Sequence, residues 1–173
     1  MPVAFHLADS GYNAFSSAWG GAPEFQGFGP SDVLGSVLVS DRAIHDTIAS
    51  LVVDGVFKRH PGLKILSVEN GSAFLHILVK RLRKQANRTP WAFAEDPLDT
   101  IRKHVWVGPY FEEDLSELAE LMGTERIMFG SDWPHGEGLE KPTDFVNELD
   151  GFDDASIRRV MRDNCLDLLG GSA

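Results

Sequence analysis

The sequence lacks the features that mark secreted, membrane-spanning or nucleic-acid-binding proteins. Its 173 residues contain one cysteine, so no internal disulfide can form, and this fits a reducing cytoplasm. No apolar run approaches the roughly 18–20 residues that cross a bilayer, and the N-terminus does not resemble a signal peptide. Acidic residues outnumber basic residues by 26 to 16, and this net charge of −10 argues against a surface that binds nucleic-acid phosphates. We therefore expect a cytoplasmic globular protein with no nucleic-acid or membrane partner.

The apolar residues instead follow an alternation of short strands and helices. Strands are predicted at residues 3–8, 63–68, 105–107 and 126–130. Helices are predicted at residues 40–59, with Ser40 as the N-cap, and at residues 74–82, 115–122, 144–149 and 154–169. This alternation implies an α/β fold with a parallel sheet and right-handed crossovers. The single cysteine, Cys165, falls in the last helical pattern, where we expect it to pack as a small buried hydrophobe.

One long segment, residues 9–38, shows no sustained helical or strand period and is rich in Gly, Ser, Pro and aromatic residues. A loop of this length inside a compact domain is usually functional or disordered. Its aromatic residues favour a lid or a pocket lining over a free linker; they are Tyr12, Phe15, Trp19, Phe25 and Phe28. We therefore expect this segment to be a long loop over an active site.

Polar residues follow each predicted strand at the point where its apolar core ends. They are His6, Glu69, the segment 109–111, and Asp132 with His135 three residues later. In a parallel α/β architecture the carboxyl ends of the strands share one rim, and that rim carries the active site. Neutral imidazole and carboxylate groups suit Zn²⁺ and similar divalent ions. The pattern therefore predicts a metal site at this rim.

Each of these residues also has a purely structural interpretation, which the local pattern leaves open. Asp132 could be an N-cap or a turn carboxylate after a strand, and Glu69, which Asn-Gly follows, could be a turn residue. His6 could be a hydrogen-bonded histidine at the rim, and His135 could contact the backbone of its own loop. The remaining histidines lie in or beside predicted helices and are expected to be surface or packing residues; they are His45, His60, His76 and His104.

Three stretches resemble the amidohydrolase-related family that includes aminocarboxymuconate semialdehyde decarboxylase. FKRHPGLKILSVENG (57–71) resembles the strand-6 region of these proteins, and RIMFGSDWPHGEG (126–138) resembles their strand-8 motif. RRVMRDNCLDLLG (158–170) resembles their closing helix, in which Asn164 matches a recurrent Asn. The resemblance implies a (β/α)8 TIM barrel with a divalent metal, usually zinc, of which this chain is the C-terminal half. Residues 1–173 would then form one partial domain that contains strands 5–8.

The resemblance also implies roles for individual residues. His6 matches a metal-ligand histidine on strand 5, and Asp132 matches the strand-8 aspartate that contacts the metal or its water and accepts a proton. Glu69 stands where the family often has a histidine, and a carboxylate does not donate a proton at neutral pH as an imidazolium does. His135, Trp133 and Trp19 would shape the pocket. The predicted catalytic residues are therefore Asp132, Glu69 and His135, and the predicted metal ligands are His6 and Asp132.

The implied activity is that of a metal-dependent hydrolase or of a non-oxidative decarboxylase. The substrate would be a small carboxylic acid, aromatic or unsaturated, to judge from the aromatic residues of the long loop. The family's His-x-His pair of strand 1 has no counterpart here, which leaves the alternative of a catalytically inactive fragment or an assembly module. A half barrel would expose parallel strand edges, so a second copy of the chain or a separate N-terminal half is the expected partner.

Overall fold

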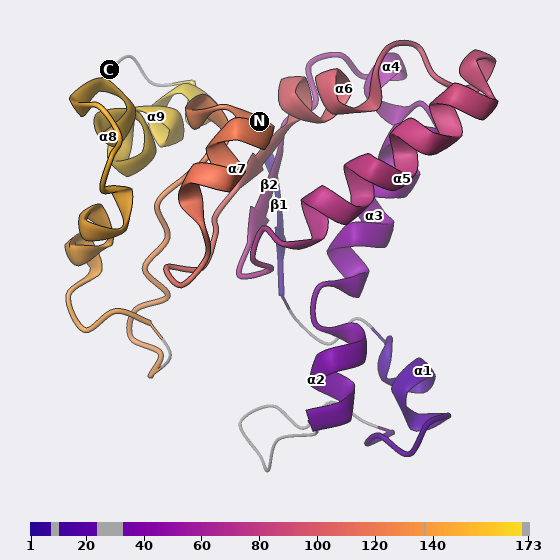
Figure 1. Ribbon diagram of the computed structural model, residues 1–173, viewed down its shortest axis with the longest axis horizontal. Helices are drawn as coiled ribbons and strands as arrows, with labels where there is room; N and C mark the ends of the chain where they lie inside the picture. Colours follow the sequence, from indigo (N-terminus) through magenta and orange to yellow (C-terminus); the bar gives the residue numbers. More distant parts are fainter. Residues whose placement is uncertain (8–10, 24–32, 137, 171–173) are drawn as a thin grey trace.

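The computed structural model describes residues 1–7, 11–23, 33–136 and 138–170 (Figure 1). Its centre is a three-stranded parallel sheet in the order β1-β2-β3, formed by β1 (Val3–His6), β2 (Ile65–Val68) and β3 (Val105–Val107). His6 is aligned with Val68, and Ser67 is aligned with Val107. All three strands run in one direction, so their carboxyl ends lie at a single rim. This confirms the predicted α/β fold with a parallel sheet.

The predicted fourth strand, residues 126–130, is reduced to one parallel bridge between Val107 and Ile127. The 3-10 helix η2 (Thr124–Arg126) precedes it, and the Met128 amide donates to the Val107 carbonyl at 2.8 Å. The next amide, of Phe129, donates to the Val160 carbonyl at 3.0 Å. The segment leaves the sheet because its backbone turns toward the closing helices after a single pairing.

The helices and the sheet enclose one large apolar core. Its fully buried members include Ile48 from α3 (Arg42–Val53), Leu75 from α5 (Phe74–Arg88) and Ile101 from α6 (Pro97–His104). Further buried residues come from α7 (Leu115–Met122) and from the 3-10 helix η3 (Pro142–Leu149). The strand residues in this core are Ile65, Val105 and Val107. These alternate along their strands with Leu66 and Trp106, which pack in a separate small cluster with Met128 and Leu168.

The predicted helix over residues 40–59 is two helices, α3 and α4 (Val56–Arg59). The chain breaks at Gly55, which has a φ of 65° and therefore occupies the left-handed region that glycine adopts without steric cost. The N-cap position is Asp41 rather than Ser40. Helix α6 was not predicted, although Asp96 caps it by accepting a hydrogen bond from the Leu98 amide.

The closing helical segment agrees with the prediction for residues 154–169. It consists of α8 (Asp154–Arg158), a π-helical turn (Arg159–Asp163) and α9 (Asn164–Leu169). The prediction that Cys165 is buried is wrong, because its side chain faces solvent on α9. His104 packs as expected: its ring stacks on Phe57 with centroids 4.5 Å apart, and its Nδ1 donates to the Leu63 carbonyl at 2.7 Å.

The predicted loop over residues 9–38 contains two short helices, α1 (Asn13–Ser17) and α2 (Val33–Val39), so the expectation of an irregular segment is wrong for these residues. Helices of five and seven residues span too few turns to show a clear period in the sequence. In Figure 1 they lie together, below the end toward which the strands run. Residues 8–10 and 24–32 of this segment, with Phe25 and Phe28, lie outside the described residues. None of the helices in the described part of the chain is long and apolar enough to cross a membrane.

Candidate active site

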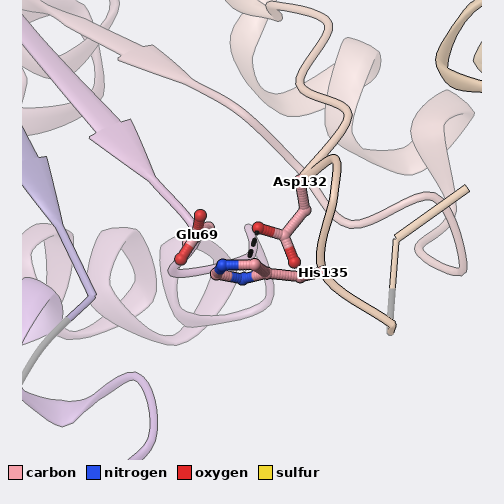
Figure 2. A group of neighbouring side chains, drawn as sticks. All are labelled: Glu69, Asp132 and His135. Carbon is pink, nitrogen blue, oxygen red and sulfur yellow. Dashed lines mark ion pairs between the residues drawn. The ribbon is translucent and has the colours of Figure 1, made fainter.

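Three of the predicted site residues meet at the carboxyl rim of the sheet. Glu69, Asp132 and His135 each place one potential ligand atom within 4.8 Å of the other two (Figure 2). Glu69 directly follows β2, whereas Asp132 and His135 lie in the turn after the Val107–Ile127 bridge. Nδ1 of His135 is 3.3 Å from Oδ1 of Asp132, and the His135 amide donates to the Asp132 carbonyl at 2.8 Å. The structure thus brings together residues that are 66 positions apart in the sequence, 69 to 135.

The two carboxylate residues of this group have unusual backbone conformations. Glu69 has a φ of 55° and Asp132 a φ of 52°, and they are the two non-glycine residues with positive φ in the described part of the chain. A side chain in this region costs about 1–2 kcal/mol, so the surrounding structure must hold each residue there. Both residues lie where a strand or bridge gives way to a loop. The strain is therefore concentrated at the two positions that deliver carboxylates to the rim.

His6, a predicted metal ligand, lies beside this group rather than within it. Its Nε2 is 3.1 Å from Oε1 of Glu69. Its Nδ1 is 2.7 Å from the Leu7 carbonyl oxygen, which can only accept, so Nδ1 carries the proton. Nε2 therefore points toward the Glu69 carboxyl. A backbone carbonyl that fixes the second ring nitrogen is the usual support of a metal-binding histidine.

The two carboxyl groups interact closely. Burial, a hydrogen bond with the Asp132 carboxyl and the negative charge of Asp132 raise the pKa of Glu69, and His6 opposes this effect. Burial and the nearby carboxylates, chiefly that of Glu113, raise the pKa of Tyr110 to about 12. The phenol is therefore neutral at pH 7, and it donates a hydrogen bond of 2.6 Å to the Glu69 carbonyl. A divalent cation would relieve the repulsion that raises the pKa of Glu69.

A cavity of about 620 Å³ opens beside Glu69 and Asp132. Its apolar walls come from Leu66, Val68, Met128, Phe129 and Leu139, and its other lining residues include Ser67, Tyr110, Phe111, Glu112 and Glu113. No Lys, Arg or His is among the described residues that line it. The three residues that were expected to shape the pocket, Trp19, Trp133 and His135, do not line this cavity, and the two tryptophans are 78% and 66% exposed. The cavity can therefore take an apolar group next to four carboxyls, those of Glu69, Glu112, Glu113 and Asp132.

Two buried asparagines support the rim. The Asn70 amide donates to the Phe5 and Val68 carbonyls at 3.1 and 2.7 Å and so ties β1 to the end of β2. The Asn164 amide donates to the Thr124 and Ile127 carbonyls, both at 2.7 Å, and so ties α9 to the segment that leads to Asp132. The resemblance singled out Asn164, and the strand pattern predicted that the segment 109–111, with Tyr110, lies at the rim, whereas no role was predicted for Asn70 or Glu113. Their places in the loops that follow predicted strands were the signal that could have indicated a role at the rim.

Comparison with known proteins identifies the family of this chain. The chain matches the family model described as amidohydrolase over residues 2–171. It is 26% identical over 130 residues to 2-amino-3-carboxymuconate-6-semialdehyde decarboxylase of Dictyostelium discoideum, a match that covers 71% of this chain and 35% of that protein.

Solved structures of similar fold include an amidohydrolase from Mycobacterium avium subsp. paratuberculosis K-10, with 55% identity and a TM-score of 0.90 over 100% of this chain and 42% of the other. A dihydroxybenzoic acid decarboxylase from Polaromonas sp. JS666, with bound manganese and the inhibitor 2-nitroresorcinol, shares the fold at 16% identity and a TM-score of 0.57, over 75% of this chain and 40% of the other. This chain thus spans less than half the length of each of these relatives. The match to the family model covers nearly the whole sequence, and the chain belongs to the amidohydrolase family.

Proposed function

We propose that this chain supplies part of the active site of a metal-dependent enzyme that removes carbon dioxide from a small aromatic or unsaturated carboxylic acid. The observation that carries the proposal is the group Glu69, Asp132 and His135, whose ligand atoms lie within 4.8 Å of one another beside a largely apolar cavity. Similarity to two decarboxylases supports the reaction class. We further propose that the chain corresponds to strands 5–8, the C-terminal half of a TIM barrel.

The donor set fits a divalent cation such as zinc or manganese. Two carboxyls lie next to each other and are flanked by imidazoles, with His6 beside Glu69 and His135 beside Asp132. Carboxylate and imidazole are ligands that zinc and manganese accept. We propose that Asp132, Glu69 and Nε2 of His6 would hold the ion. When bound, the ion supplies Lewis-acid polarisation of a substrate oxygen.

The residues of this chain would handle the substrate and one proton. In decarboxylation the bond between the carboxyl carbon and its neighbour breaks, carbon dioxide leaves, and a proton must reach the carbon that keeps the electron pair. His135 is half-exposed and contacts Asp132 at 3.3 Å, so its imidazole is placed to carry that proton. Leu66, Val68 and Met128 would pack against the apolar body of the substrate and keep water from it.

A hydrolase is the second candidate, and one specific observation favours it. The Mycobacterium relative that is 55% identical over the length of this chain is described as an amidohydrolase. In that reaction Asp132 would accept a proton from the attacking water.

A polypeptide partner that covers an edge of the sheet is also part of the proposal. β1 pairs with β2 along one edge within the described residues, so we propose that a second copy or an N-terminal half covers the other edge.

The experiment is metal analysis of the purified chain after incubation with Zn²⁺ or Mn²⁺ and removal of free ions, followed by assays with dihydroxybenzoic acid. We expect stoichiometric metal in the wild-type protein, its loss in Asp132→Asn, and release of carbon dioxide that requires the metal. Metal binding with hydrolysis of amides or esters and no carbon dioxide would favour the hydrolase. No metal above background at neutral pH would instead identify the chain as an inactive fragment or an assembly module.

A further inference from the structure

The loop after β2 is held in place by a carboxylate from another part of the chain. Both oxygens of Glu113 accept hydrogen bonds from the Ser72 amide, at 2.8 and 2.9 Å. Oε1 also accepts from the Ala73 amide at 3.1 Å, and Oε2 accepts from the Tyr110 amide at 2.9 Å. These amides belong to two loops, one after β2 and one after β3. Glu113 therefore joins the two loops through their backbones.

The same two loops are joined again at Glu69. The Tyr110 hydroxyl donates to the Glu69 carbonyl at 2.6 Å, so Glu113, Tyr110 and the backbone from Glu69 to Ser72 form a closed ring of contacts. Gly71 lies inside this ring with a φ of 62°, and a Cβ there would come within 2.9 Å of the Tyr110 ring and 3.1 Å of Oε1 of Glu113. The ring is thus closed tightly around the residues that follow Glu69.

Glu69 needs such support because of its backbone. With a φ of 55° it occupies a conformation that a glutamate adopts only when its neighbours impose it. Its carboxyl reaches both His6 and Asp132 from this conformation. Glu113 is not itself a member of the group that could hold a metal among the described residues.

We propose that Glu113 is a positioning residue of the candidate active site, which fixes the loop after β2 against the loop after β3 and so keeps the Glu69 carboxyl next to Asp132. This inference rests on the proposed function, because it assigns Glu113 a part in the metal site. The competing role is structural: Ser72 and Ala73 precede α5, and Ala73 makes no side-chain cap of its own, so Glu113 could serve as a cap and nothing more.

The test compares Glu113→Gln with Glu120→Gln, which removes an exposed carboxylate of α7 that does not line the cavity and leaves the ring of contacts intact. Three measurements are made on each protein: the dissociation constant and EPR spectrum of bound Mn²⁺, the ¹³C chemical shift of the Glu69 carboxyl, and the exchange rates of the amides of Ser72, Ala73 and Tyr110.

For Glu113→Gln we expect Mn²⁺ affinity to fall by about 10-fold or more, as for other residues that orient a ligand, with a changed EPR spectrum and a shifted Glu69 signal. Glu120→Gln should change affinity by less than about twofold, since an exposed charge acts weakly on a site it does not contact. Faster amide exchange in Glu113→Gln with an unchanged Glu69 signal and unchanged Mn²⁺ affinity would overturn the inference, because Glu113 would then only cap α5.

The outcome also separates the two proposals. If the wild-type protein binds no Mn²⁺, the proposed function fails, and the Glu69 signal alone decides the role of Glu113. A shift of that signal in Glu113→Gln but not in Glu120→Gln would then support the positioning role without the metal. An unmoved signal would overturn it.

Discussion

The two faces of the three-stranded sheet are covered very differently. Ile65, Val105 and Val107 point into the large core formed with α3, α5, α6 and α7, and each is 1% exposed or less. On the other face Leu66 and Trp106 pack with Met128 and Leu168, and Leu66 and Met128 also line the cavity next to Glu69 and Asp132. One face therefore contributes most of the buried apolar surface, and the other carries the candidate chemistry.

The largest difference between the faces should appear when the same substitution is made on each. Leu78→Ala, in the core on α5, should lower the free energy of unfolding by about 2–5 kcal/mol, because it leaves a cavity among fully buried neighbours. Leu66→Ala should cost less than half as much, because Leu66 already borders a cavity. Urea denaturation measures both. Equal costs would contradict the difference between the two faces and mean that a second copy or another polypeptide covers the face of Leu66 in solution.

A smaller but still clear loss is expected for Asn164→Ala. The substitution removes the side-chain amide that donates to the Thr124 and Ile127 carbonyls and leaves the buried Ile127 carbonyl without this donor, which should cost about 1–3 kcal/mol. Asn147→Ala is the matched control, since Asn147 is exposed on η3 and should change stability by no more than about 0.5 kcal/mol. Thermal denaturation of the two variants checks this. Equal melting temperatures would show that the link between α9 and the Ile127 segment contributes nothing.

The free energy of unfolding should also depend on pH through the face that carries the candidate active site, and not through the core. Burial and the Asp132 carboxyl raise the pKa of Glu69, so the folded protein keeps this proton at pH values where the unfolded chain has lost it. The resulting stabilisation is complete below the ordinary value of 4.5 and is lost as the pH rises through the higher folded-state pKa. Without metal, Glu69→Gln should therefore gain stability relative to the wild type as the pH rises above 4.5. Urea titrations in EDTA measure this, and parallel pH curves for the two proteins would contradict it.

The smallest effect is expected at Cys165, which faces solvent although its neighbours Asn164 and Leu168 are buried. Cys165→Ser should change the free energy of unfolding by no more than about 0.5 kcal/mol. The thiol should also react with a water-soluble disulfide reagent in the native protein. A thiol that reacts only after denaturation would show that another surface covers this side of α9.

The sequence predicted the strands and the long helices well because their apolar periods are local. Ile44, Ile48 and Val52 lie on one face of α3, and all three are buried. Helix α6 was overlooked although Asp96 and Pro97 form a readable start signal, since its eight residues give few periodic positions. The fourth strand shrank to one bridge because the competing partner of Phe129, the Val160 carbonyl, lies 31 residues away, and no local pattern reveals it.

Part of the candidate site was predictable as well, because the topology of the sheet determines it. A parallel sheet places all carboxyl ends at one rim, so the meeting of Glu69, Asp132 and His135 followed from topology. The contacts of Glu113 with Ser72 and Ala73 did not follow, because they depend on the paths of two loops. The left-handed conformations of Glu69 and Asp132 were equally invisible, since neither residue is the glycine that usually marks such a position.

The attachment of Asn164 to the Ile127 carbonyl has a practical consequence for protein engineering. The segment that carries Asp132 pairs with the sheet through one bridge at Ile127. The Ile127 carbonyl also accepts a hydrogen bond from Asn164 of α9, the last helix. Substitutions along the buried side of α9, at Leu168 for example, should therefore alter the reach of Asp132 without changing any residue that meets a ligand. A library of substitutions in α9 would change the position of Asp132 without contact between α9 and a ligand. Removal of α9 would remove the hydrogen bond that holds the segment from Ile127 to Asp132.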